Sequence, residues 1–245
     1  MLRVEKLEKS FDGFMAVNGV ELSLDKERVV AVIGPNGAGK TTLFNLITGH
    51  LSPTRGKVWF KNQDITGLAP HRICHKGLSR SFQLINIFPQ LTVYENVQVA
   101  LLSQQKKVLK MLTPSKAMLE EETYSILEKV GLADYAGIQC TYLSYGDQKI
   151  LEMAIALGNK PEMLMLDEPT AGMSPEETIS TLRLIRDLAE KEKLFILFTE
   201  HNMNVVFDIA EKIMVMQQGR TIAQGLPAEV RADKQVQAAY LGEES

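Results

Sequence analysis

The feature that most constrains this chain is a glycine-rich segment directly after a run of apolar, mostly β-branched residues. The run, Val29-Val30-Ala31-Val32-Ile33, predicts a strand that is buried on both faces. The segment after it, Gly34-Pro35-Asn36-Gly37-Ala38-Gly39-Lys40-Thr41, fits the pattern G-x-x-x-x-G-K-[ST] at every fixed position. Residues 41–49 then have helical character. A strand, a glycine-rich loop and a helix in this order predict a phosphate-binding loop.

The residue types of this loop suit the binding of a nucleotide. Its glycines allow a tight turn that points successive N–H groups into one anion-binding nest, and the helix that follows adds the positive end of its dipole. Lys40 supplies a positive charge for the β- and γ-phosphates, Thr41 a hydroxyl for Mg²⁺, and Thr42 a hydrogen bond for the α-phosphate. The loop residues expected around the phosphates are Asn36, Gly37, Ala38 and Gly39. GTPases, kinases and ATPases share this loop, so the motif alone leaves the three open.

Two adjacent acids follow another apolar strand, which is expected at residues 163–166. A phosphate-loop enzyme needs a carboxylate at a strand tip to hold Mg²⁺ through water, and Asp167 has that position. Glu168 is placed to polarise an attacking water. His201 follows a strand expected at 194–199, and strand tips in such sheets converge on the ligand edge. This histidine is therefore a candidate γ-phosphate contact, although a histidine after a strand is often structural.

Strands and helices alternate along most of the chain, which predicts an α/β fold around a largely parallel sheet. The pattern changes between Leu91 and about Gly131. One helix is expected to begin there with Thr92 and Glu95 as a capping box, and a second to span 118–130. This mostly helical block interrupts strand-rich flanks and is interpreted as an inserted subdomain.

Composition excludes several classes of protein. The chain has 245 residues, of which 45% are hydrophobic and 23% charged, so it can bury an ordinary core and is not a disordered, collagen-like or disulfide-dependent chain. Its formal net charge of −3 argues against a nucleic-acid partner. The short basic cluster at 104–110 is interpreted as a solvated helix face.

The cysteines and the apolar runs indicate where the chain works. Cys74 and Cys140 lie far apart without metal-ligand spacing, which is typical of free thiols in a reducing compartment. The first residues are charged where a signal peptide is apolar, and no apolar run approaches the roughly 18 residues of a membrane span. A cytoplasmic protein is expected, whose membrane role, if it has one, requires a partner.

Further motifs resemble those of the ATP-binding-cassette (ABC) ATPases. Leu143-Ser144-Tyr145-Gly146-Asp147-Gln148 is similar to the family's signature LSGGQ; it precedes the two acids and opens a helix. Gln83, within Arg80-Ser81-Phe82-Gln83, matches the family's Q-loop, His201 its H-loop, and Phe11 its adenine-stacking aromatic. The motifs stand in the family's order, and the resemblance covers essentially the whole chain.

The resemblance implies a fold and a set of site residues. The fold is that of a P-loop NTPase of the ABC-ATPase type: one domain, 1–245, with a catalytic core and antiparallel β region at 1–90 and 158–245, and a helical subdomain at 91–157 that includes the signature. The ligands implied are ATP and Mg²⁺. The catalytic residues implied are Glu168, His201 and Gln83; the Mg²⁺ residues are Thr41, Gln83 and Asp167; the nucleotide-binding residues are Phe11, Val17, Asn36, Gly37, Ala38, Gly39, Lys40, Thr41, Thr42, Ser144 and Gly146.

The sequence departs from the family pattern at three positions. Tyr145 stands where the signature has its first glycine, and Asp147 where it has its glutamine. An extra acid weakens binding of a triphosphate unless its side chain points away. Ser174 replaces the aspartate that the family often has after the two acids, so the role of that aspartate is not carried over.

A narrower resemblance, to Liv-type branched-chain amino-acid importers, is carried by residues 80–83, 88–97, 143–148, 171–177 and 239–243. It implies that two cassettes, alike or different, stack head to tail beneath two transmembrane permeases, on the inner face of the membrane. A periplasmic or extracellular solute-binding protein feeds the permeases. Two alternatives stay open: an ABC ATPase for another envelope process such as lipopolysaccharide export, and a soluble ATP switch.

Overall fold

The computed structural model describes residues 1–81, 87–104 and 119–241. Its central sheet has the strand order β10-β9-β3-β8-β7-β6. All neighbouring strands are parallel except the β9–β10 hairpin, which confirms the expected α/β fold with a largely parallel sheet. The strands are β3 (Val29–Ile33), β6 (Leu78–Arg80), β7 (Met163–Asp167), β8 (Phe195–Thr199), β9 (Lys212–Gln217) and β10 (Arg220–Gly225).

A second sheet is antiparallel, with the order β2-β1-β4-β5. Its strands are β1 (Leu2–Phe11), β2 (Phe14–Leu24), β4 (Arg55–Phe60) and β5 (Gln63–Asp64). Alternation of polar and apolar residues in the sequence predicts two short strands, at 2–7 and 20–24. The β1–β2 hairpin is longer, because register shifts between Val4 and Ser10 interrupt the alternation. The hairpin brings Phe11 and Phe14 opposite each other at its tip.

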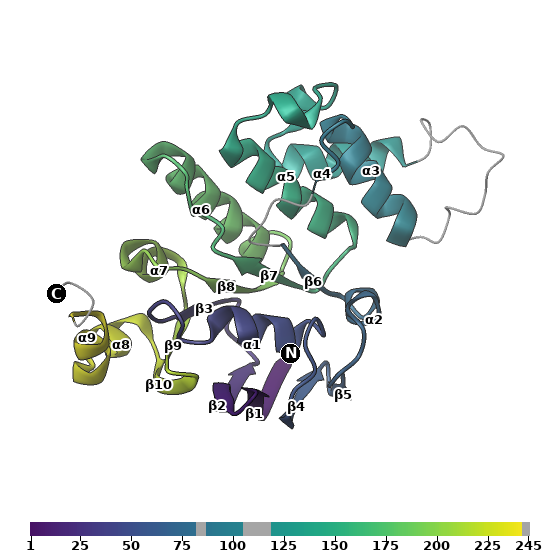
Figure 1. Cartoon of the computed structure of the whole chain (residues 1–245). Coiled ribbons are helices and arrows are strands. Elements are labelled where there is room, and N and C mark those ends of the chain that lie inside the picture. The colour runs from purple at the N-terminus through teal and green to yellow at the C-terminus, as the bar shows by residue number, and fades with distance from the viewer. Residues whose placement is uncertain (82–86, 105–118, 242–245) are drawn as a thin grey trace.

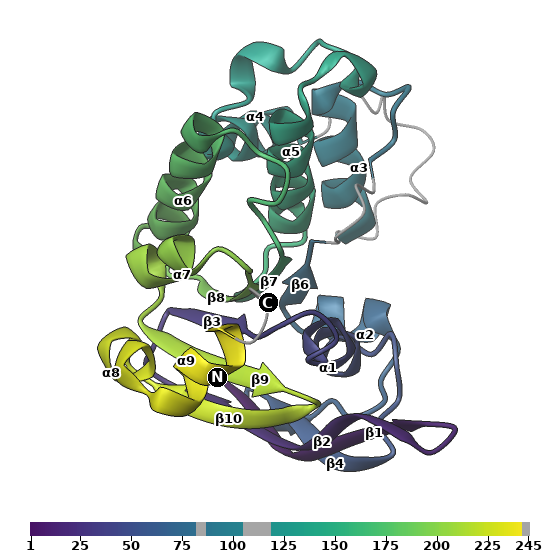
Figure 2. The same ribbon diagram turned by 60° about the vertical axis from the view of Figure 1, so that its left-hand side comes forward.

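Two layers cover opposite faces of the central sheet: several helices on one face, and the antiparallel sheet with helix α1 on the other (Figures 1 and 2). On one face, Ala31, Ile33 and Phe198 pack in a core that includes residues of α3, α4, α5, α6 and α7. On the other face, Val30 and Val32 pack with α1 and the antiparallel sheet. The helices are α1 (Lys40–Ile47), α2 (Pro70–His75), α3 (Val93–Gln104), α4 (Glu120–Val130), α5 (Tyr145–Gly158), α6 (Pro175–Glu190), α7 (Met203–Ile209), α8 (Pro227–Ala232) and α9 (Lys234–Leu241).

The helical block between β6 and β7 begins at the capping box that the sequence predicts. The Glu95 N–H donates to the Thr92 hydroxyl over 3.1 Å, and the Glu95 carboxylate accepts from the Thr92 N–H over 2.9 Å. The block consists of α3, α4 and α5, which pack against one another beside the sheet (Figure 1). The expected start of α4 at 118 and the basic cluster from 105 to 110 lie outside the described residues.

Candidate active site

The glycine-rich loop joins β3 to α1 and needs glycine at two positions for steric reasons. A Cβ atom at Gly34 would lie 2.1 Å from the Met216 carbonyl oxygen, and one at Gly39 would lie 2.4 Å from the Ala16 carbonyl oxygen. The φ angle of Gly39 is 100°, in a region that other residues rarely adopt. At Gly37, in contrast, a Cβ would meet nothing within 4 Å, so this part of the loop is open. The loop is thus clamped at its ends and exposed in its middle.

Lys40 lies within the curve of this loop. Its side chain is buried, and its ammonium donates to the carbonyl oxygens of Gly34 at 2.5 Å and Pro35 at 3.1 Å. An ammonium has three donors and no acceptor, so it suits an anion next to the loop. Because α1 begins at Lys40, the N-terminus of that helix points to the same place.

A cleft of about 450 Å³ opens over the loop. Its lining brings together most of the residues that the sequence analysis singled out, from four separate segments: Phe11, Asn36, Gly37, Ala38, Gly39, Lys40, Thr41, Thr42, Glu168 and His201. Phe14 and Ala16 also line it. Val17 is fully buried in the core instead, and its neighbour Ala16 occupies the wall of the cleft.

Phe11 and Phe14 form the apolar end of the cleft. Their side chains are 42% and 70% exposed, an unusual position for large aromatic rings. The ammonium of Lys9 lies 5.0 Å from the centre of the Phe11 ring. A flat, apolar ligand group could stack at this end. Phe14 was missed because the sequence shows only a turn around it.

Asp167 ends β7 and is almost fully buried, with 1% of its surface exposed. The Thr199 hydroxyl donates to its Oδ1 over 2.7 Å, and the Arg80 guanidinium donates to its Oδ2 over 2.7 Å. A carboxylate has about four lone-pair positions, so both oxygens can still accept a further bond. These contacts fix the carboxylate at the carboxyl edge of the sheet, where hard oxygen ligands suit Mg²⁺.

Glu168 turns away from the strand because its backbone is left-handed, with φ 50°. Its N–H donates to the carbonyl and hydroxyl oxygens of Thr199 over 3.1 and 3.0 Å. Its Oε1 lies 2.6 Å from the Nε2 of His201. The two side chains, which are 15% and 43% exposed, therefore form a bonded pair on the wall of the cleft.

Glu200 supports this pair and was not recognised in the sequence. It is 3% exposed, and its carboxylate accepts from the N–H and hydroxyl of Thr170 over 3.0 and 2.6 Å, and from the His201 N–H over 3.2 Å. It thereby ties the segment after β7 to the segment after β8. Nothing in the sequence indicates that an acidic residue after a strand will bond to a separate segment of the chain.

Ser144 and Gly146 lie elsewhere, at the N-terminus of α5, and neither is among the residues that line the cleft. The Ser144 hydroxyl caps the helix by accepting from the Asp147 N–H over 3.0 Å, and it donates to the Asp147 carboxylate over 2.9 Å. A Cβ at Gly146 would lie 2.5 Å from the Glu177 carboxylate of α6. Hydrogen bonds from Ser174, its N–H first, and a further one with Ser144 lower the pKa of Glu177. The signature is therefore packed on the start of α6.

The unusual Tyr145 packs across the same junction. A Cβ at Gly172, whose φ is 78°, would lie 3.1 Å from the Tyr145 ring. The ammonium of Lys149 lies 5.9 Å from the centre of that ring. Glycine at 172 therefore makes room for the aromatic side chain that replaces a signature glycine.

Gln83, which the sequence analysis expects in the site, lies outside the described residues. In 1–81, 87–104 and 119–241, no group of three or more His, Cys, Asp or Glu side chains is placed to hold a metal ion. None of the helices in these ranges is long and apolar enough to cross a membrane.

Comparison with known proteins identifies the family. Residues 17–171 match the family model described as "ABC transporter", and residues 220–245 match a model described as "Branched-chain amino acid ATP-binding cassette transporter". The chain therefore belongs to the ABC transporter family and is an ATPase of that family. This confirms the resemblance that the motifs indicate. Membership implies binding of adenine nucleotide, pairing of cassettes and membrane permeases as partners.

Individual relatives match over almost their whole length. The high-affinity branched-chain amino acid transport ATP-binding protein LivG of Escherichia coli K12 is 41% identical, covering 99% of this chain and 98% of LivG. The lipopolysaccharide export system ATP-binding protein LptB of Haemophilus influenzae is 33% identical, covering 100% and 98%. A crystal structure of the ADP conformation of MJ1267, an ATP-binding cassette of an ABC transporter, superposes with a TM-score of 0.88 at 32% identity, covering 99% and 98%.

Proposed function

We propose that this chain is the ATP-hydrolysing motor subunit of an importer for branched-chain or related amino acids. The observation that carries the proposal is the 41% identity to LivG across nearly the full length of both chains. The match of residues 220–245 to a model of branched-chain amino acid cassettes supports it independently of the catalytic motifs. The transported amino acid is selected by the permeases and the solute-binding protein, not by this chain.

The residues of the cleft bind ATP in this proposal. The adenine stacks on the exposed ring of Phe11, and the phosphates lie on the open part of the loop around Gly37. Lys40 exchanges its bonds to loop carbonyls for bonds to the β- and γ-phosphates. Asn36, Ala38, Gly39 and Thr42 complete the cradle; Val17, which is buried, supports this wall from behind.

A hydroxyl and a carboxylate fit the Mg²⁺ that accompanies ATP. Thr41 lines the cleft at the first turn of α1, and Asp167 is fixed at the edge of the sheet with lone pairs to spare. Gln83 would complete the set. When bound, Mg²⁺ supplies positive charge to the β- and γ-phosphate oxygens.

Hydrolysis depends on the pair formed by Glu168 and His201. Glu168 accepts a proton from water as the water oxygen bonds to the γ-phosphorus, and the bond from that phosphorus to the β–γ bridging oxygen breaks to leave ADP and phosphate. His201 holds the carboxylate through its 2.6 Å contact and faces the γ-phosphate. Their position on the wall of the cleft supports these roles.

A second cassette completes the nucleotide site. Because Ser144 and Gly146 do not line the cleft of their own chain, their phosphate contact is made to the ATP of a partner cassette stacked head to tail. ATP then joins the two cassettes, and loss of the γ-phosphate releases them, as in a two-state switch. We assign the catalytic core to 1–90 and 158–245 and the permease-facing helical subdomain to 91–157, on the cytoplasmic face of the membrane.

Isolation of the chain from its native membranes, in mild detergent with ATP and vanadate, tests the transport assignment. Two multi-span permeases and a second cassette should co-purify, and vesicles containing this complex should take up labelled leucine, isoleucine or valine when the solute-binding protein is added. The Lys40→Ala variant is the matched control and should abolish uptake without loss of the permeases. The similarity to LptB makes lipopolysaccharide export the second candidate, and co-purification of its components would replace the first. Recovery of soluble partners alone would overturn both.

A further inference from the structure

Arg80 is a buried cation next to the nucleotide cleft, at the end of β6. Its side chain is only 6% exposed. One nitrogen of the guanidinium donates to Asp167 of β7 over 2.7 Å. The other amino nitrogen donates to Asn45 of α1 over 2.6 Å and to Thr48, the C-cap of that helix, over 3.3 Å.

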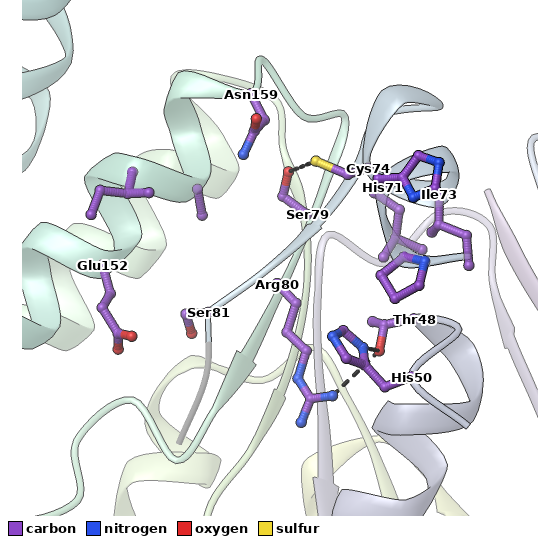
Figure 3. A pocket seen from close by; sticks show the side chains of 14 residues that line it. Thr48, His50, His71, Ile73, Cys74, Ser79, Arg80, Ser81, Glu152 and Asn159 are labelled. Atoms are coloured by element: carbon purple, nitrogen blue, oxygen red, sulfur yellow. Dashed lines mark hydrogen bonds between the residues drawn. The ribbon is translucent and has the colours of Figure 1, made fainter. Parts of the chain in front are cut away.

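The same guanidinium lies 5.7 Å from the centre of the Phe44 ring, also on α1. Figure 3 shows the Arg80 side chain extending from its strand toward Thr48. Both residues line a cavity of about 260 Å³. The fork of Arg80 therefore joins two elements that are separate in the sequence. These are the elements that carry Thr41 and Asp167, the proposed Mg²⁺ residues.

Two different residues hold the two oxygens of the Asp167 carboxylate in place. Thr199 of β8 holds Oδ1, and Arg80 holds Oδ2. A planar guanidinium can bond to β7 and α1 at once and in fixed directions, whereas a lysine ammonium is a single point of charge on a flexible stem. Arginine at this position thus supplies both charge and geometry.

We propose that Arg80 is a positioning residue for the metal site: by tying α1 to β7 it holds the Asp167 carboxylate where Mg²⁺–nucleotide requires it. This rests on the proposed function. In this assignment Arg80 acts through Asp167, because its two amino nitrogens donate to Asp167, Asn45 and Thr48. Loss of groups that orient a metal ligand typically lowers metal affinity by roughly 10- to 100-fold.

The test is Arg80→Lys in the full-length chain, which keeps the positive charge and removes the fork. Mn²⁺, a spectroscopic probe for Mg²⁺, is titrated into the ADP-loaded protein and followed by electron paramagnetic resonance. We expect the Mn²⁺ affinity to fall about 10- to 100-fold while the affinity for ADP without metal is unchanged. In ATPase assays the half-saturating Mg²⁺ should rise, and turnover at saturating Mg²⁺ should recover.

Two further variants separate positioning from folding. Arg28→Lys makes the same substitution at an arginine that lies over Phe195, away from the cleft, and should leave Mn²⁺ affinity unchanged. Thr48→Val together with Asn45→Ala removes the contacts of Arg80 to α1 and its C-cap, along with the bonds of the Thr48 hydroxyl to Phe44 and His50, and keeps the bond from Arg80 to Asp167. It should weaken Mn²⁺ binding in the same direction, so the test does not depend on folding of Arg80→Lys. Wild-type Mn²⁺ affinity in folded Arg80→Lys would overturn the inference. Failure of the wild-type chain to bind Mn²⁺ with ADP would instead overturn the proposed function.

Discussion

Replacing Glu168 with glutamine separates the chemistry of this site from its architecture. The change keeps the volume of the side chain and the backbone bonds from the Glu168 N–H to Thr199. It removes the carboxylate that, in the proposed mechanism, accepts the proton of water. Glutamine can still bond to His201 through its amide, so the wall of the cleft keeps its shape.

The expected effects of Glu168→Gln on stability and on rate differ greatly in size. One altered hydrogen bond at a partly exposed pair costs about 0.5–1.5 kcal/mol, a small share of the roughly 5–15 kcal/mol that holds a domain folded. Loss of a positioned general base costs about 10²–10⁴ in rate. At about 1.36 kcal/mol per factor of ten, this adds roughly 2.7–5.4 kcal/mol to the barrier. The fall in rate therefore greatly exceeds any effect of unfolding.

Phosphate release with Mg²⁺–ATP measures the rate, and calorimetry with ATP measures binding. Glu168→Gln should bind ATP as the wild type does and hydrolyse it at most about one hundredth as fast. Glu176→Gln, the same change at an exposed acid in the first turn of α6, is the control and should keep full turnover. Near-normal hydrolysis by Glu168→Gln would show that this carboxylate is not the base.

Two substitutions and one labelling experiment test other parts of the site and the core. Lys40→Ala should weaken ATP binding roughly 10- to 100-fold by loss of a charged hydrogen bond, and unchanged calorimetry would refute the role of the loop. Ser144→Arg should leave nucleotide binding to the monomer intact and abolish ATP-induced pairing; dimers persisting in sedimentation would refute the stacked arrangement. Burial, with the charge of Glu95, raises the pKa of Cys140 to about 11, so about one thiol in a thousand is ionised at pH 8. Alkylation of native protein at that pH should stop at Cys74, as peptide mapping would show, and rapid labelling of Cys140 would contradict its burial.

The glycine-rich part of the candidate site could be predicted because its residues are close in sequence and specific in type. The strand at 29–33, the loop and α1 are contiguous, and each residue type has a local reason to be there. Asp167 and Glu168 were predicted as the acids that follow an apolar strand at 163–166. In the structure this strand, β7, is one residue longer and includes Asp167. The sequence also predicts the N-terminus of α6, because Ser174 can cap a helix that has Pro175 at its first position and acids in its first turn. The structure confirms this start, with a capping box between Ser174 and Glu177.

The parts that were missed depend on long-range contacts. β6 has three residues and no apolar pattern of its own; it is a strand because it pairs with β7. Arg80 and Glu200 look like ordinary charged residues, and only tertiary structure shows that each is buried against a specific partner. The length of the β1–β2 hairpin was underestimated because bulges interrupt its alternation.

The distance of the signature from the cleft of its own chain has a genetic consequence. In the proposed head-to-tail pair, a defect in Lys40 and a defect in Ser144 damage different composite sites, even when both occur in one polypeptide. Suppose that two copies pair, one lacking only Lys40 and the other lacking only Ser144. Both defects then lie in the same composite site, and the second composite site is intact. The proposed arrangement therefore predicts that two inactive alleles of this gene complement each other. With an unlike partner cassette, it predicts that a Ser144 allele damages the site that holds the partner's nucleotide.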